Sequence, residues 1–249
     1  MNISYGINQK TSLTLFFLGW LGLWVFALII AGILPSLVPL FLDEASTAIF
    51  LESLFFFQMV NFLTYLSLFF IGIAILFPYL KETFLPALIS FKWIVGIPFT
   101  FAILFTSYFM MTLYQWLGIT LEDNQNQAAI VQLVLDAPLI SFITFGLLGP
   151  IVEEWTYRLG LFKVLKEKNR VLAYGVTLTI FGLIHFDFTA VNLLNELLNL
   201  PIYLIAGAWF CFLYDRFGLQ VAMATHITNN VLSVLSIIAS ANLGSSSLL

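Results

Sequence analysis

Long apolar stretches alternate with short polar junctions along the whole chain, and this pattern predicts membrane-spanning helices. Four stretches without Asp, Glu, Lys or Arg exceed the roughly 20 residues that cross a bilayer as an α-helix; they are 11–42, 53–80, 93–121 and 217–249. Their apolar residues do not alternate with polar ones, which argues against the strand pattern of a membrane β-barrel. We predict about seven spans, at 12–34, 53–77, 94–118, 139–163, 172–190, 194–214 and 219–240.

The short apolar segment 128–137 has two interpretations. It ends at Asp136-Ala137-Pro138 and is too short to cross a bilayer. It is either an interfacial helix or the start of the fourth span, and as a separate element it would raise the count to eight. The sequence has no internal repeat and no soluble domain, so we predict one membrane-embedded domain over 1–249. We also expect no cleavable signal peptide, because the first apolar run is longer than a signal core.

The composition agrees with an all-α polytopic transmembrane helical bundle. Hydrophobic residues make up 61% of the chain, charged residues make up 9%, and the mean hydropathy is +1.03. A soluble domain carries roughly 25% charged residues. The net charge of −4 with scattered cations gives no basic face for nucleic acid. The single cysteine, Cys211, excludes an intrachain disulfide and a cysteine-ligated metal cluster.

The distribution of charge between the junctions predicts the orientation. With a cytoplasmic N-terminus and seven spans, 8 of the 9 cations fall on one side; they are Lys10, Lys81, Lys92, Lys163, Lys166, Lys168, Arg170 and Arg216. The opposite side holds only anions, namely Asp43, Glu44, Glu122, Asp123 and Asp187. This is the positive-inside bias of membrane proteins. We therefore expect an integral membrane protein with a cytoplasmic N-terminus, in a bacterial inner membrane given its short loops.

The ninth cation, Arg158, lies inside a predicted span beside two carboxylates. Ionisable side chains cost at least about 2.5–3.5 kcal/mol each at the bilayer centre, so unpaired ones are usually functional. Glu154 and Arg158 are four residues apart and can pair on one helix face. Glu153 lies about 140° around the helix from Arg158 and stays available for chemistry. Pro150 removes a backbone donor and should bend the helix just before the pair.

Both histidines of the chain lie in later predicted spans. His185 ends Phe181-Gly182-Leu183-Ile184-His185, and His226 lies four residues before Asn230 on one helix face. In lipid, imidazole and amide groups turn inward to find hydrogen-bond partners. We therefore expect three helices to bring their polar side chains together, although simple helical rise places His185 deeper than Glu153 or His226.

A carboxylate and an imidazole that share a water molecule can deprotonate it, which is general-base catalysis. A second His with an Asn amide supplies donors for an oxyanion, where one donor is worth about 10²–10³ in rate. The cluster suits hydrolysis of an acyl bond, most naturally a peptide bond. Alternatively, Glu153, His185 and His226 form a His₂Glu set of the kind that binds catalytic zinc. The sequence has no HExxH motif, so zinc is permitted and not demanded.

These three stretches, in this order, resemble the CAAX protease and bacteriocin-processing (CPBP, or Abi) family of intramembrane proteases, whose motifs are EExxxR, FxxxH and HxxxN. The resemblance covers roughly 138–240, which would be the catalytic helices. It implies that Glu153 and His185 activate water, that His226 and Asn230 stabilise the oxyanion, and that Glu154 and Arg158 brace the first helix. Leu159 stands where family members often have Gly. The implied substrate is a membrane-associated peptide or protein, which is prenylated for eukaryotic members.

Two other function classes remain open. A proton- or ion-coupled transporter also uses buried Glu and His, although it commonly shows repeated halves. A non-catalytic immunity protein could sequester a peptide without cutting it. Outside the motifs, we interpret Glu52, Asp136 and Glu196 as interfacial, with Glu196 the best placed of the three to line a cavity. The run Lys163–Arg170 is interpreted as a solvated loop facing lipid headgroups.

Overall fold

The computed structural model describes residues 7–246, and within them every regular element is a helix. The α-helices are α1 (Gln9–Leu37), α2 (Glu44–Glu52), α3 (Leu54–Tyr79), α4 (Leu85–Ile89), α5 (Gly96–Trp116), α6 (Gln125–Asp136), α7 (Pro138–Ser141), α8 (Gly149–Glu154), α9 (Lys163–Lys166), α10 (Arg170–Leu183), α11 (Leu193–Phe217) and α12 (Leu219–Ser246). Short 3₁₀ turns are η1 (Val38–Leu40) and η3 (Lys92–Val95), and π-helical stretches are η2 (Leu80–Phe84), η4 (Phe142–Leu148) and η5 (Trp155–Phe162).

Polar N-caps explain where several of these helices begin. The side chains of Asn8, Asp43, Ser53, Asn124 and Asn169 each accept a hydrogen bond from a backbone N–H in the first turn of the helix that follows. These bonds satisfy donors that have no partner within the helix. The polar junctions of the sequence are therefore the start signals of its helices.

The predicted all-helical membrane bundle is confirmed, with one difference in the number of spans. Six helical segments of the described chain are long and apolar enough to cross a membrane; they are Gln9–Leu40, Leu54–Ile89, Lys92–Trp116, Pro138–Lys166, Leu193–Phe217 and Leu219–Leu243. The predicted span 172–190 corresponds to α10, which has only 14 residues. Its apolar run continues to Ile184, but the chain then leaves the helix and forms a turn at Asp187, whose carboxylate accepts hydrogen bonds from Thr189.

The segment 128–137 belongs to α6, which is a separate helix and not the start of the next span. The two are divided at Ala137, whose backbone has φ −136° and ψ 74°. This extended conformation is expected for a residue that precedes proline, because the ring of Pro138 disfavours the α region at Ala137.

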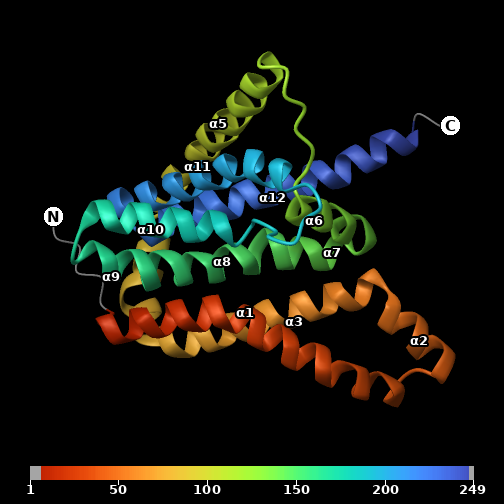
Figure 1. Ribbon diagram of the computed structural model, residues 1–249. Helices are drawn as coiled ribbons and strands as arrows, with labels where there is room; N and C mark the ends of the chain where they lie inside the picture. The colour runs from red at the N-terminus through yellow and green to blue at the C-terminus, as the bar shows by residue number, and fades with distance from the viewer. Residues whose placement is uncertain (1–6, 247–249) are drawn as a thin grey trace.

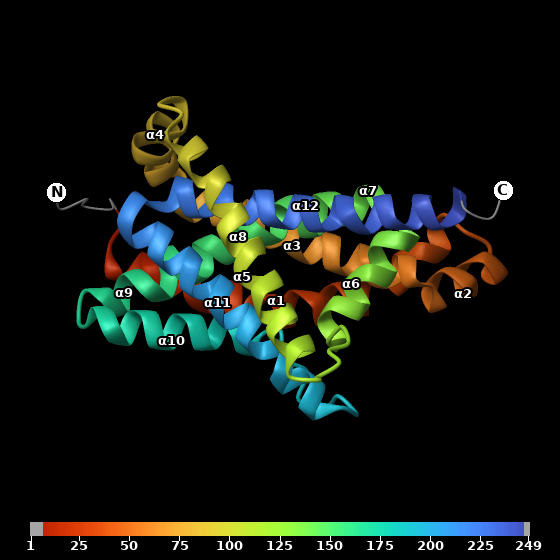
Figure 2. The same ribbon diagram turned by 90° about the horizontal axis from the view of Figure 1, so that it is seen from above.

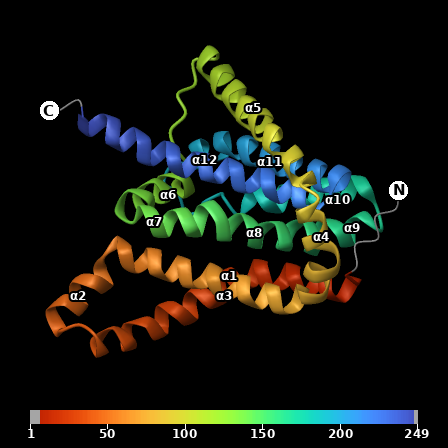
Figure 3. The ribbon, with the colours of Figure 1, turned by 180° about the vertical axis from the view of Figure 1, so that it is seen from behind.

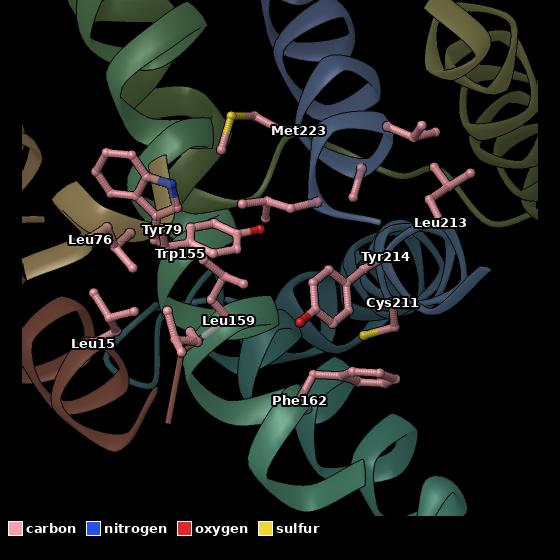
Figure 4. Packing of buried hydrophobic residues seen from close by; sticks show 14 of the residues in the cluster. Leu15, Leu76, Tyr79, Trp155, Leu159, Phe162, Cys211, Leu213, Tyr214 and Met223 are labelled. Carbon is pink, nitrogen blue, oxygen red and sulfur yellow. The ribbon is translucent and has the colours of Figure 1, made fainter. Parts of the chain in front are cut away.

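The segment from α7 to α9 runs through the middle of the bundle. In the most apolar 18-residue stretch of this segment, 61% of the residues are buried, compared with 11–33% in the other five spans. Figures 1 and 3 show it between the α1–α3 pair on one side and α10–α12 on the other. The buried cluster around its inner half includes Trp155, Leu159 and Phe162 together with Cys211 and Tyr214 of α11 (Figure 4). Polar groups in the central segment are thus shielded from lipid.

A close crossing of α1 and η5 depends on Gly160, and it yields a test of the packing. A Cβ placed on Gly160 would lie 2.8 Å from the backbone nitrogen of Phe16. We expect Gly160→Ala to lower the free energy of unfolding by about 1–3 kcal/mol, since the helices must move apart. Gly175→Ala in α10 is the matched control, because its Cβ would meet nothing within 4 Å. Thermal unfolding in detergent micelles measures both, and an unchanged midpoint for Gly160→Ala would contradict the packing.

Candidate active site

One cavity of about 360 Å³ brings the three polar stretches of the sequence together. Glu153 of α8, His185 after α10, and His226 and Asn230 of α12 all line it. Its remaining wall includes further polar side chains from α3, α5 and α6. The structure thus places these groups around one space that is large enough for a peptide segment and water. The greater depth expected for His185 does not separate it from the others.

Glu154 and Arg158 form the ion pair expected from their spacing. The Arg158 Nη1 and Glu154 Oε1 atoms are 3.3 Å apart, and both side chains are fully buried. The same Glu154 oxygen lies 2.9 Å from His226 Nδ1 and accepts its hydrogen. Glu154 therefore does more than neutralise the guanidinium, because it also fixes the orientation of an imidazole on another helix.

His226 points its second ring nitrogen toward Glu153. Its Nε2 atom lies 3.7 Å from Glu153 Oε2, which is too long for a direct hydrogen bond. The imidazole stacks on Phe210 with ring centroids 4.2 Å apart. His226 is consequently held between two carboxylates, with its edge facing the cavity.

Arg158 is stabilised by aromatic rings as well as by its carboxylate. The guanidinium carbon lies 4.8 Å from the centre of the Phe181 ring and 5.2 Å from that of Phe210. None of its three nitrogens makes a hydrogen bond within the described chain, so cation–π attraction in a desolvated site compensates its burial. The Phe181 ring therefore contributes an electrostatic contact to the site as well as packing.

His185 lies beyond the helical end of α10 and is held by its backbone neighbours. Its Nδ1 atom donates to the carbonyl oxygen of Phe181 at 2.8 Å. Since a carbonyl only accepts, this bond leaves the other ring nitrogen, Nε2, as an acceptor in the neutral imidazole. The ring also stacks on Tyr203 with centroids 4.5 Å apart. A neutral, oriented histidine of this kind can accept a proton from water.

Asn230 links the helix of the two glutamates to α12. Its Nδ2 atom donates to the carbonyl oxygen of Phe145 at 3.1 Å. In the π-helical register of η4, in which Gly149 bonds to Thr144, the next donor to Phe145 would be residue 150. That residue is Pro150, which has no N–H. Besides any bend that it causes in the helix, Pro150 thus leaves the Phe145 carbonyl without a backbone donor, and this carbonyl positions Asn230.

The six predicted residues do not form a metal centre in this arrangement. Within residues 7–246, no three His, Cys, Asp or Glu side chains are placed to hold one ion. His226 Nδ1 is engaged by Glu154, and His185 Nδ1 by a backbone carbonyl. These Nδ1 bonds leave both Nε2 atoms available, so the His₂Glu alternative stays a prediction. We derive no step through a metal.

The structure changes two of the sequence-based interpretations of residues outside the motifs. Glu196 is buried and accepts hydrogen bonds from the backbone N–H groups of Gln125 and Asp187, so it joins two loops and does not line the cavity. The run Lys163–Arg170 is not a purely solvated loop, because Lys166 and Arg170 form ion pairs with Asp215 of α11. These pairs hold the α9–α10 turn against the end of α11.

A known protein family is similar to the part of the chain that carries the three motifs. Residues 135–232 match the model of the family described as type II CAAX prenyl endopeptidase Rce1-like. Residues 135–232 are thus similar to this family, and we call them the Rce1-like segment. The resemblance to the CPBP family that the three motifs indicate is thereby confirmed. A protein of Bacillus subtilis (strain 168), named "Putative membrane peptidase YdiL", is 29% identical over 116 residues, which are 46% of this chain and 43% of that protein. No solved structure matches the chain.

The Rce1-like segment contains all six predicted site residues, but some residues that line the cavity, or that hold its lining residues in place, lie outside it. Tyr65 of α3 donates a hydrogen bond to Glu153. Asn124, before α6, donates to the backbone carbonyl of His185 at 2.9 Å and accepts from the Tyr203 hydroxyl at 3.1 Å. Tyr65 and Asn124 were not predicted, because nothing in an apolar span or a polar junction relates them to the motifs.

Proposed function

We propose that the protein is an intramembrane endopeptidase that hydrolyses a peptide bond with a water activated by Glu153 and His185. The observation that carries the proposal is the meeting of Glu153, His185 and His226 around one cavity. The peptidase family of residues 135–232 supports the same reaction class. Because the aligned segment covers only 43% of the matched relative, the activity of the whole protein is part of the proposal.

The charges around the cavity suit a single mobile proton. Glu153 and Glu154 supply two negative charges, and Arg158 supplies one positive charge. Buried charges are stable only when they are paired, so one further proton, which this mechanism places on His226, makes the cluster neutral. A water between Glu153 and His185 Nε2 would give up its proton to this pair as its oxygen attacks the carbonyl carbon. The departing amine would take that proton when the peptide bond breaks.

The oxyanion formed by this attack would be stabilised from α12. His226, protonated with Nδ1–H on Glu154, directs Nε2–H toward the cavity. The Asn230 amide has two hydrogens, of which the Phe145 carbonyl accepts one. The other is free to donate to the oxyanion. Such fixed donors need no reorganisation during the reaction.

The environment of the reaction follows from the charge pattern. We propose that the chain lies in a bacterial inner membrane with its N-terminus in the cytoplasm. The positive-inside bias indicates this orientation when the short helix α10 is counted as a crossing. The substrate would be a membrane-associated peptide or protein, since the cavity lies inside the helical bundle. We assign no prenyl group to it.

The direct experiment compares membrane proteins from cells that express wild-type protein or Glu153→Gln. New peptide termini that occur only with the wild type are expected, and they identify the cleaved bond. Identical termini in both membranes would contradict a peptidase. Glu153-dependent flux of a solute into proteoliposomes, with no change in termini, would favour transport instead.

Asn230→Ala tests the oxyanion assignment. We expect kcat to fall by about 10²–10³-fold with little change in KM, because the lost donor acts mainly in the transition state. The comparison variant is Asn229→Ala, which removes a neighbouring amide that also lines the cavity and donates to Asn230 at 3.4 Å. Cleavage kinetics on the identified peptide measure both variants. If Asn230→Ala lowered the unfolding temperature and left kcat intact, the residue would only join helices.

A further inference from the structure

The bundle has two ends of opposite charge. At one end, here called the cationic end, Lys166 and Arg170 pair with Asp215 beside the α9–α10 turn. At the other, the anionic end, the loop with Glu122 and Asp123 is bonded to the start of α11 through Asn195. Figure 2 shows α9 and α4 toward one end of the molecule and α2 and α6 toward the other. The two ends can therefore be assigned to different faces of the membrane.

The cavity is closed toward the cationic end. Phe181 and Phe210, each no more than 3% exposed, line the cavity where they pack against His226 and the guanidinium of Arg158, and we call this apolar side its floor. Closer to the cationic end, Leu159 and Phe162 belong to a buried core to which several helices contribute (Figure 4). This close-packed apolar layer offers neither water nor a peptide a path to the site from that end.

Toward the anionic end, in contrast, the wall of the cavity is polar and becomes exposed. Asn126 and Gln127, in the first turn of α6, line it directly after the loop of Glu122 and Asp123. Ser233 of α12, seven residues beyond His226 toward the C-terminal end, lines it and is exposed. Polar groups thus lead from Glu153 to the anionic surface.

The rim carries negative charge. Glu122 and Asp123 are exposed beside the first turn of α6. Asp187 lies two residues after His185, and hydrogen bonds from the hydroxyl and backbone N–H of Thr189 lower its pKa, so it is ionised at neutral pH. A peptide with Lys or Arg next to its membrane segment would be favoured here over an acidic one.

We propose that the site opens at the anionic end, on the extracytoplasmic face, and takes the extracytoplasmic flank of a membrane-anchored peptide that carries basic residues there. This inference rests on the proposed function, which makes the peptide a substrate. It also rests on the positive-inside bias, which assigns the anionic end to the extracytoplasmic face. The side of access itself follows from the closed floor and the polar wall.

Thiol labelling tests the side of access without any need for activity. Asn126→Cys and Ser233→Cys place a thiol at the proposed mouth, and Lys168→Cys places one at the cationic end. Cys211 can stay in place, because it is fully buried and reports unfolding if it reacts. In intact bacterial cells, a membrane-impermeant maleimide should label the two mouth variants at least tenfold more than Lys168→Cys. Permeabilised cells should remove this difference.

Equal labelling in intact cells, or preference for Lys168→Cys, would overturn the proposed side of access. The termini mapped by comparing wild type with Glu153→Gln provide the second test. Termini on the extracytoplasmic flank, beside Lys or Arg, are expected, and termini on the cytoplasmic flank would overturn the inference while leaving the peptidase intact. If instead the peptidase proposal were wrong, the peptide termini would be identical in both membranes while the labelling pattern stayed as expected.

Discussion

Glu153→Gln should reduce kcat/KM for the cleaved peptide by at least about 10²–10⁴-fold, the contribution expected of a positioned general base. The substitution keeps the size of the side chain but replaces an oxygen that accepts a proton with an amide that cannot. The water beside His185 Nε2 would then lack the carboxylate that helps to deprotonate it. Cleavage of a synthetic peptide containing the identified bond, in proteoliposomes, measures the effect.

Glu167→Gln is the matched control for this substitution. Glu167 pairs with Lys163 at 2.9 Å, and its side chain is 51% exposed, away from the cavity. A carboxylate-to-amide change there should leave kcat/KM unchanged. If Glu153→Gln were folded, with an unchanged unfolding midpoint, and as active as wild type, a Glu153-activated water would be ruled out.

Arg158→Met should cause the largest loss of stability, about 3–5 kcal/mol, because it leaves the buried Glu154 carboxylate without its ion-pair partner. It also removes the cation that contacts the rings of Phe181 and Phe210. We expect a lower unfolding midpoint in detergent and a partly accessible Cys211. Denaturant unfolding followed by Cys211 labelling measures both effects.

The double variant Glu154→Gln/Arg158→Met separates charge from packing. It removes both buried charges and keeps an amide oxygen that can accept from His226 Nδ1. It should therefore recover a large part of the stability that Arg158→Met loses, as replacements of whole buried ion pairs do. A double variant no more stable than Arg158→Met would show that stacking, and not charge balance, dominates.

Short-range spacing explains which parts of the site could be predicted from the sequence. Glu154 and Arg158 are four residues apart in one helix, so their pairing needs no knowledge of the rest of the fold. The convergence of Glu153, His185 and His226 followed from the cost of leaving polar groups in lipid. The catalytic roles of these residues stay predictions until the variants are measured.

Contacts between distant segments could not be predicted in the same way. The bond of Glu154 to His226 joins residues 72 positions apart, and that of Asn124 to the His185 backbone joins residues 61 apart. Tyr65 lies in a span that reads only as apolar. Likewise, apolar composition could not show that α10 ends at Leu183, because its end depends on Glu196 and Asn124 satisfying the backbone of the turn that follows.

The shortness of α10 has a consequence for the surrounding lipid. Its 14 residues extend about 21 Å, compared with about 30 Å for the hydrocarbon thickness of a typical bilayer. Acyl chains beside it must compress or tilt, as they do around any helix that is too short for its membrane. The lipid headgroups and their bound water would therefore lie closer to His185. Local thinning of the bilayer would thus bring the water that hydrolysis consumes near the site.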